Sequence, residues 1–149
     1  MARTSWLRAL SVLLAFALGA SCASSVVEAE DRGVRDEYEL LTWRPASADD
    51  VPGHWRVRSL HGPAAAALMD LAYWLDANGR FSGAALFVGP PPTYEVLSGT
   101  WTLSGEGLLR LGEDAEPARA EVATLAGNQT WLRLSGAEGS LVLEHALIR

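Results

Sequence analysis

The sequence contains no lysine and only one cysteine, Cys22. A single cysteine cannot form an intramolecular disulfide, so the folded part of the chain must be stabilised by its hydrophobic core. The 12 basic residues are all arginines, scattered singly along a chain that carries 18 acidic residues. Because a surface that binds nucleic acid needs clustered basic side chains, we expect no nucleic-acid partner.

Long apolar runs are also missing, apart from one near the N-terminus. Residues Ala9 to Ala20 are apolar except for Ser11, and they follow Arg3 and Arg8. A short basic start, an apolar run and an end rich in small residues are typical of a signal peptide. A membrane-spanning helix is the weaker interpretation, because crossing the hydrocarbon core takes about 20 apolar residues. We therefore predict an exported protein whose signal peptide covers residues 1–22.

Cys22 follows this run directly, in the segment Leu18-Gly19-Ala20-Ser21-Cys22. The segment resembles the lipobox of bacterial lipoproteins, although Gly19 stands where those signals usually carry leucine or another aliphatic residue. The resemblance implies that Cys22 is acylated and anchors the chain to a membrane. The alternative is simple cleavage after Ser21-Cys22-Ala23, which would remove the cysteine and release a soluble protein. Both alternatives predict an exported protein of the bacterial cell envelope, which is lipid-anchored in the first case and periplasmic or secreted in the second. The protein would contact the membrane only through the lipid anchor, if Cys22 is acylated.

Residues 23–50 differ in composition from the rest of the chain, because acidic, arginine and small residues dominate them. Without the signal peptide, 10 arginines remain against 18 acids, a net charge of about −8. The segment offers too little apolar surface to fold alone, although Val34, Tyr38 and Leu41 fall at the spacing of one short helix. We predict an acidic tether over residues 23–50, followed by one domain over residues 51–149.

The predicted domain alternates between strand-like and turn-like stretches. In Trp55-Arg56-Val57-Arg58, apolar and polar residues alternate with the period of a half-buried strand. Asn78-Gly79 is a strong signal for a two-residue hairpin turn, because both residues tolerate positive φ. Such criteria predict eight strands, over Gly53–Leu60, Leu71–Leu75, Arg80–Val88, Tyr94–Leu103, Leu108–Gly112, Ala118–Leu125, Thr130–Leu134 and Ser140–Ile148.

Short strands joined by tight turns, with almost no helical pattern, favour an all-β fold. Closing an antiparallel meander removes exposed strand edges, so we predict an eight-stranded antiparallel meander barrel. A two-sheet β-sandwich is the alternative, because turn spacing does not distinguish the two. Pro63 to Met69 is the one helical signal, and it would form either a cap over the mouth of the barrel or a flexible alanine loop. Pro90–Pro92 would rim the same opening or simply stiffen its loop.

The first predicted strand begins with Gly53-His54-Trp55, which resembles the G-x-W signature of the lipocalins. Gly99-Thr100-Trp101 and the hairpin Leu75–Phe81 add to this resemblance. Together with the strand count, they make the chain similar to bacterial lipocalin-like domains over most of residues 51–149.

The resemblance implies that Gly53 and Trp55 form a structural motif in which the tryptophan plugs one end of a barrel. In that family an arginine from a late strand covers the tryptophan, and here it would be either Arg133 or Arg149. Envelope domains of the META type are the second choice. Gly79–Gly83 is similar to their Gly-Arg-Phe-Ser-Gly, but the Gly-Cys-Asn that typically follows is absent.

An eight-stranded barrel can be filled by its own side chains or can hold one small ligand. Small residues between two rings on one face of the third predicted strand would leave room for a small apolar ligand. These candidate ligand-binding residues are Phe81, Gly83, Ala85 and Phe87. In the alternative, which we favour because a small domain needs its apolar side chains for stability, the interior is filled. The filling side chains would be Trp55, Leu97, Trp101 and Leu109.

The sequence shows no catalytic motif. It has no G-x-S-x-G, and Gly105-Glu106-Gly107 lacks the third glycine of a dinucleotide loop. His54, His61 and His145 would lie on neighbouring strands of a closed barrel, but a zinc or copper site needs more ligands and a supporting shell. We therefore expect no catalysis, no cofactor and no metal.

These observations together predict a non-catalytic, exported β-barrel module of the cell envelope, and binding of a small apolar ligand is the first hypothesis for its function. The first alternative is an interaction or inhibitor domain, whose loops or outer face bind another envelope protein. The second alternative is a minor metal-dependent enzyme that uses the three histidines.

Overall fold

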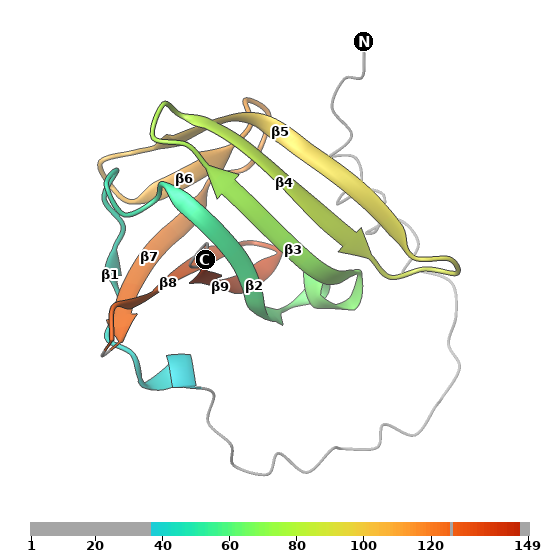
Figure 1. Ribbon diagram of the computed structural model, residues 1–149, viewed down its shortest axis with the longest axis horizontal. Coiled ribbons are helices and arrows are strands. Elements are labelled where there is room, and N and C mark those ends of the chain that lie inside the picture. Colours follow the sequence, from blue (N-terminus) through green and yellow to red (C-terminus); the bar gives the residue numbers. More distant parts are fainter. Residues whose placement is uncertain (1–36, 126, 147–149) are drawn as a thin grey trace. The chain divides into compact units, whose positions relative to one another are not determined.

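The structure, a computed structural model, describes residues 37–125 and 127–146. The predicted signal peptide and Cys22 lie outside these residues. The described chain forms two short 3-10 helices and nine strands (Figure 1). The helices are η1 (Glu37–Leu40) and η2 (Pro63–Ala66), and the strands are β1 (Arg44–Pro45), β2 (Gly53–His61), β3 (Leu68–Leu75), β4 (Arg80–Phe87), β5 (Thr93–Leu103), β6 (Leu108–Leu111), β7 (Ala118–Leu125), β8 (Gln129–Gly136) and β9 (Gly139–His145).

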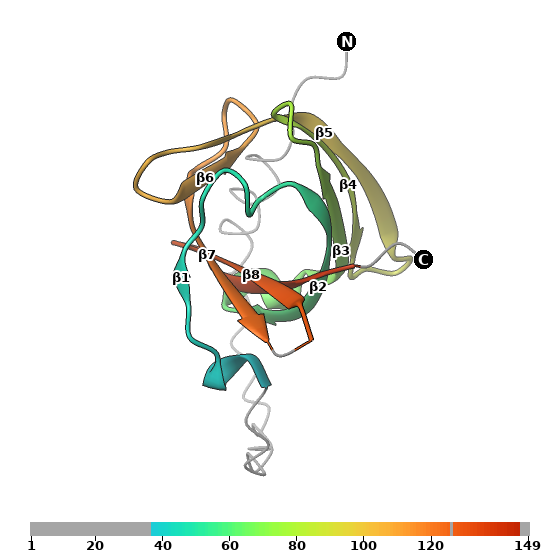
Figure 2. The ribbon, with the colours of Figure 1, turned by 60° about the vertical axis from the view of Figure 1, so that its left-hand side comes forward.

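Strands β2 to β9 form one antiparallel meander, in which each strand pairs with the next. The last strand, β9, pairs with β2, for example Leu143 with Val57, and this pairing closes the sheet around a common interior (Figure 2). Each predicted strand corresponds to one of these strands, with ends shifted by a few residues. The predicted eight-stranded antiparallel barrel is therefore confirmed, and the two-sheet sandwich is excluded.

A ninth strand, β1, precedes the predicted domain. Strand β6 pairs with β7 only at Ala118 and Arg119, so the rest of that edge of β7 is left to β1. There Arg44 pairs with Val122, and the Ala46 N–H donates to the carbonyl of Ala120 at 2.9 Å. The compact unit that contains the barrel begins at Leu40. Residues 40–50, which we expected in the tether, therefore belong to the barrel unit.

The turn between β3 and β4 differs from the two-residue turn predicted at Asn78-Gly79. Within it only Gly79 has a positive φ, 82°. The Gly79 N–H donates to the carbonyl of Asp76 at 3.0 Å, and the Asp76 N–H donates to the carbonyl of Arg80 at 2.8 Å. These bonds define a type I turn closed by a glycine in the left-handed region. The hairpin was predicted in the right place, but the turn type was wrong.

The helical signal at Pro63 to Met69 yields only η2. Strand β3 begins at Leu68, which pairs with Phe87 of β4. A short isolated helix is only marginally stable in water, whereas pairing with a neighbouring strand provides hydrogen-bond partners for the backbone N–H and C=O groups. The prediction of a helix was therefore wrong beyond Ala66. The Val88 N–H donates to the carbonyl of Ala67 at 2.9 Å, so the β2–β3 and β4–β5 connections lie side by side at one end of the barrel, which we call the η2 end.

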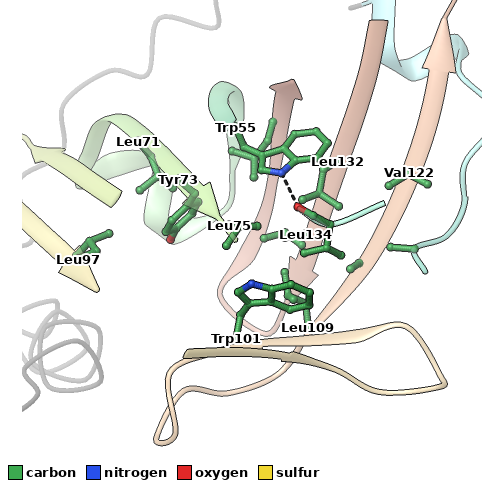
Figure 3. Packing of buried hydrophobic residues seen from close by; sticks show 14 of the residues in the cluster. Trp55, Leu71, Tyr73, Leu75, Leu97, Trp101, Leu109, Val122, Leu132 and Leu134 are labelled. Carbon is green, nitrogen blue, oxygen red and sulfur yellow. Dashed lines mark hydrogen bonds between the residues drawn. The ribbon is translucent and has the colours of Figure 1, made fainter. Parts of the chain in front are cut away.

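The barrel interior holds the main hydrophobic cluster (Figure 3). Alternate residues of each strand point inward, as in β3, where Leu71, Tyr73 and Leu75 are each at most 3% exposed. Trp55 is fully buried and Trp101 is 8% exposed. No charged side chain is buried among the residues that the structure describes. The barrel is therefore stabilised by an apolar core.

A second buried set lies on the outer face of β7, β8 and β9. Ala123, Trp131 and Val142 are each at most 3% exposed, yet they alternate with the inward-facing residues and lie outside the core cluster. Arg133, which also points outward, stacks on Trp43 with its guanidinium carbon 4.4 Å from the ring centroid. The segment just before β1 therefore lies against this outer face.

Candidate functional site

Gly53 and Trp55 shape the end of the barrel that we call the Trp55 end. Gly53 has a φ of 151°, and a Cβ there would collide with the ring of His145, whose Cδ2 would lie 2.8 Å away. A glycine is therefore needed beneath that ring. The Trp55 indole meets His145 edge to face at 5.0 Å, and its Nε1 donates to the carbonyl of Val51 at 2.8 Å (Figure 3). These contacts close the Trp55 end.

Gly99 and Trp101 repeat this arrangement on β5. A Cβ on Gly99 would lie 3.0 Å from the ring of Phe81, so this glycine also makes room for a ring. The Trp101 Nε1 donates to the carbonyl of Asp76 at 2.8 Å. Both G-x-W segments therefore use the glycine to accommodate an aromatic ring and the indole to hold a loop carbonyl.

The arginine that the lipocalin resemblance implies is not seen over Trp55 in the described residues. Arg133 stacks instead on Trp43, and it pairs with Glu121 at 2.7 Å. Arg149 lies outside the described residues. The ring that contacts Trp55 is that of His145.

Asp50 organises the loop that leads into the Trp55 end. The Arg44 guanidinium donates two hydrogen bonds of 2.7 Å to its carboxylate. The backbone N–H and the hydroxyl of Ser47 donate to Oδ2 at 2.7 and 2.6 Å. The hydrogen bond from Arg44, with smaller help from Ser47, holds the pKa of Asp50 well below its ordinary value of 3.8 despite partial burial. This carboxylate therefore has a structural role.

The predicted ligand-binding residues occupy the inner face of β4. Ala85 is 1% exposed and belongs to the core cluster, and Phe81 and Phe87 pack against that cluster. Gly83 shares this face by alternation. The ring of Tyr73 lies against it, since a Cβ on Gly83 would be 2.9 Å from Tyr73 Cδ1. The structure therefore brings the predicted residues onto one inner face, and Tyr73 occupies the room beside Gly83.

Tyr73 places a polar group in this apolar interior. The residue is 3% exposed, and its ring meets that of Phe81 edge to face at 6.2 Å. No hydrogen bond joins its hydroxyl to another group within the described ranges. Burial raises the pKa of the Tyr73 hydroxyl above its ordinary value of 10.0. Sequence reasoning missed this residue, although its place between Leu71 and Leu75 in an alternating strand was the available signal.

Large side chains fill the part of the interior near the Trp55 end. The expected filling residues, Trp55, Leu97, Trp101 and Leu109, all belong to the core cluster. In Figure 3, Tyr73 and Leu97 lie on the side of this cluster away from the two tryptophans. Tyr73 therefore lies apart from the two tryptophans within the core cluster.

On the surface of the described residues, two hollows lie on the outer side of the barrel, and neither includes the predicted ligand-binding residues. The larger, of about 630 Å³, lies where β2 and β3 each carry a bulge. Its charged side chains form two ion pairs, Arg56 with Asp70 at 3.2 Å and Arg58 with Glu144 at 3.1 Å. The second hollow lies over β5, β6 and the connection after them. The charged residues of the first hollow thus lie on the outer face of three neighbouring strands, β2, β3 and β9.

The histidines have separate surroundings. His54 stacks on Trp74 with ring centroids 5.4 Å apart, and His61 Nε2 lies 2.8 Å from the hydroxyl of Ser59. His145 packs on the Trp55 end. No group of three or more histidine, cysteine, aspartate or glutamate side chains in residues 37–125 and 127–146 is placed to hold a metal ion.

Comparisons with known proteins identify no relative. A scan against models of protein families found no match, and searches of curated proteins and of solved structures found no significant similarity. Among the described residues, no helix has both the length and the apolar character needed to cross a bilayer.

Proposed function

We propose that this protein is an exported, non-catalytic β-barrel module of the bacterial cell envelope that binds a small, mostly apolar molecule inside its barrel. The site extends from Tyr73 towards the η2 end, along Gly83, Ala85 and Phe87. The bound molecule carries one hydrogen-bond acceptor, which meets the Tyr73 hydroxyl.

The Tyr73 hydroxyl is the observation that carries this proposal. Tyrosine hydroxyls that lie in a mostly apolar interior usually find a hydrogen-bond partner. This hydroxyl finds none among the described residues. An acceptor atom of a ligand would supply the missing bond, and a single polar group in an apolar pocket would fix the orientation of that ligand.

The difference between the two ends of the barrel supports the same site. Trp55 and Val51 are fully buried at the Trp55 end. On the way to the η2 end, Leu68 and Phe87 are only partly buried, although they pack against the core. A ligand would therefore enter from the η2 end, and it must be small because the tryptophans fill the rest of the interior.

The N-terminal sequence and the lipocalin resemblance support the cellular setting. The apolar run before Cys22 favours export, and eight-stranded barrels of the lipocalin type can hold one small ligand. The uncharged interior excludes strongly ionic ligands, because burying an unpaired charge is costly.

Mass spectrometry of solvent extracts from the purified protein tests the proposal, together with titration by prodan, a small apolar ketone whose fluorescence reports its surroundings. We expect one extractable molecule per chain. Tyr73→Phe should weaken prodan binding by roughly fivefold to tenfold, the equivalent of one hydrogen bond. Tyr94→Phe is the matched control, because Tyr94 is 75% exposed. An empty extract, together with equal prodan binding by both variants, would overturn the proposal.

A further inference from the structure

The η2 end of the barrel presents an uncharged, apolar surface. Residues 62–69 and 81–94, which include the two connections there, contain no charged residue, although 20% of the whole chain is charged. The hydrogen bond between Val88 and Ala67 keeps these connections together, and both project at the same end of the barrel (Figure 1). The two uncharged segments therefore lie together at the η2 end of the barrel.

Large apolar side chains are exposed on this surface. Met69 is 55% exposed, Val88 is 58% exposed and Tyr94 is 75% exposed. Pro90–Pro92, at the tip of the β4–β5 connection, are exposed as well. Exposed apolar groups that gather in one patch mark an interaction site, and tyrosine suits the boundary between an apolar phase and water.

Two arginines lie beside this surface. Arg56 and Arg58 point outward from β2 and line the same hollow as Met69. Their side chains are 66% and 58% exposed, although they pair with Asp70 and Glu144. A guanidinium group matches the geometry of a phosphate. An apolar tip with arginines at its side therefore matches hydrocarbon that is bordered by phosphate groups.

We infer that the η2 end docks on the surface of a phospholipid bilayer. Met69, Val88 and Tyr94 enter the boundary between headgroups and acyl chains, and Arg58 faces the phosphates. Val88 stands on the projecting β4–β5 connection, and Met69 and Tyr94 lie near the adjoining ends of β3 and β5. A lipid surface fits this tip better than a protein, because residues 86–94 carry no charge, whereas a protein interface has a polar rim. The inference is independent of the proposed ligand, since an empty barrel would leave this surface unchanged.

A fluorescent label can test whether residue 88 enters the bilayer. Cys22→Ser removes both the acylation site and the only thiol. On this background, Val88→Cys and the control Val96→Cys are labelled with the environment-sensitive dye NBD after purification of the exported chain. Val96 is 84% exposed but lies within β5, paired with Ala84. With vesicles of phosphatidylcholine, we expect a blue shift and quenching by spin-labelled lipid at position 88 but not at position 96.

Vesicle flotation gives the second measurement. On the Cys22→Ser background, Val88→Asp should weaken binding to phosphatidylcholine vesicles by roughly tenfold, because an acid must then enter the apolar boundary. Val96→Asp adds the same charge elsewhere and should leave binding unchanged. Arg58→Gln should weaken binding more on vesicles that contain one quarter phosphatidylglycerol than on phosphatidylcholine alone.

Three results would contradict lipid docking. The first is the absence of binding to either vesicle, and the second is equal loss in the two aspartate variants. The third is a blue shift of the NBD label at position 88 on self-association or on addition of another protein, but not on addition of lipid. That result would assign the surface to a protein partner.

Discussion

Tyr73 and Gly83 are register partners across β3 and β4, and the tyrosine ring lies against the glycine. A Cβ on Gly83 would be 2.9 Å from Tyr73 Cδ1, so the ring can pack here only because the side chain is absent. The small residue that sequence reasoning interpreted as room for a ligand thus makes room for the tyrosine. The hydroxyl that this ring carries is the group to which we assign ligand recognition.

Gly83→Ala should destabilise the barrel by about 2 kcal/mol, because the added methyl group would meet the Tyr73 ring and the carbonyl of Ala72. Urea denaturation followed by tryptophan fluorescence measures the change. Gly136→Ala is the control, since nothing lies within 4 Å of a Cβ there, and it should change stability by less than about 0.5 kcal/mol. Equal effects of the two substitutions would refute the packing assigned to Tyr73.

The raised pKa of Tyr73 predicts a loss of stability at alkaline pH. Burial favours the neutral hydroxyl in the folded state, so its contribution is complete below the ordinary tyrosine pKa of 10.0 and is lost as pH rises beyond it. The free energy of unfolding should therefore fall as pH rises above about 10. This fall should be smaller in Tyr73→Phe and unchanged in Tyr94→Phe. An identical fall in both variants would show that Tyr73 does not cause it.

The lowered pKa of Asp50 predicts a loss of stability at acid pH. Arg44 and Ser47 favour the ionised carboxylate in the folded state, so the contribution is complete above the ordinary pKa of 3.8 and is lost as pH falls below it. At pH about 7, Asp50→Asn should cost about 1–2 kcal/mol of unfolding free energy. In Asp50→Asn, the free energy of unfolding should also fall less at acid pH than in the unmodified protein. Asp49→Asn, at the exposed neighbouring position, is the control. If Asp49→Asn lowered the free energy of unfolding as much as Asp50→Asn, the stabilising role assigned to the Asp50 carboxylate would be wrong.

Cys22 provides a test of export and anchoring. If the lipobox-like segment is processed as in lipoproteins, cells fed radioactive palmitate should incorporate the label into the chain, and Cys22→Ser should abolish it. Ser21→Ala is the control, because alanine is also a small residue and should keep the label. An unlabelled chain recovered from the periplasm would favour simple cleavage, and retention in the cytoplasm would refute export.

The strand pattern was predictable because each strand has one buried face. In β2, Trp55 and Val57 alternate with Arg56 and Arg58, and a shift by one residue would bury the arginines. The inward face of β4 was predictable for the same reason. The turn at Gly79 was predicted in place but not in type, because Asn78-Gly79 is compatible with more than one hairpin geometry.

The candidate site was only partly predictable. Alternation predicted that Phe81, Gly83, Ala85 and Phe87 share one face, but it does not say which side chain from another strand reaches that face. The contact of Tyr73 with Gly83 depends on the pairing of β3 with β4, which alternation alone does not specify. The stacking of Arg133 on Trp43 likewise joins two residues that lie far apart in the sequence, one before β1 and one in β8.

The sequence by itself determined the eight-stranded meander, because period-two alternation and turn residues act over a few neighbouring positions. Only the tertiary structure decided that β1 completes the edge of β7, that His145 lies over Gly53, and that the Tyr73 ring packs against Gly83 in the barrel interior. These contacts join residues far apart in the chain. Their geometry depends on barrel closure and strand register, which no local pattern contains.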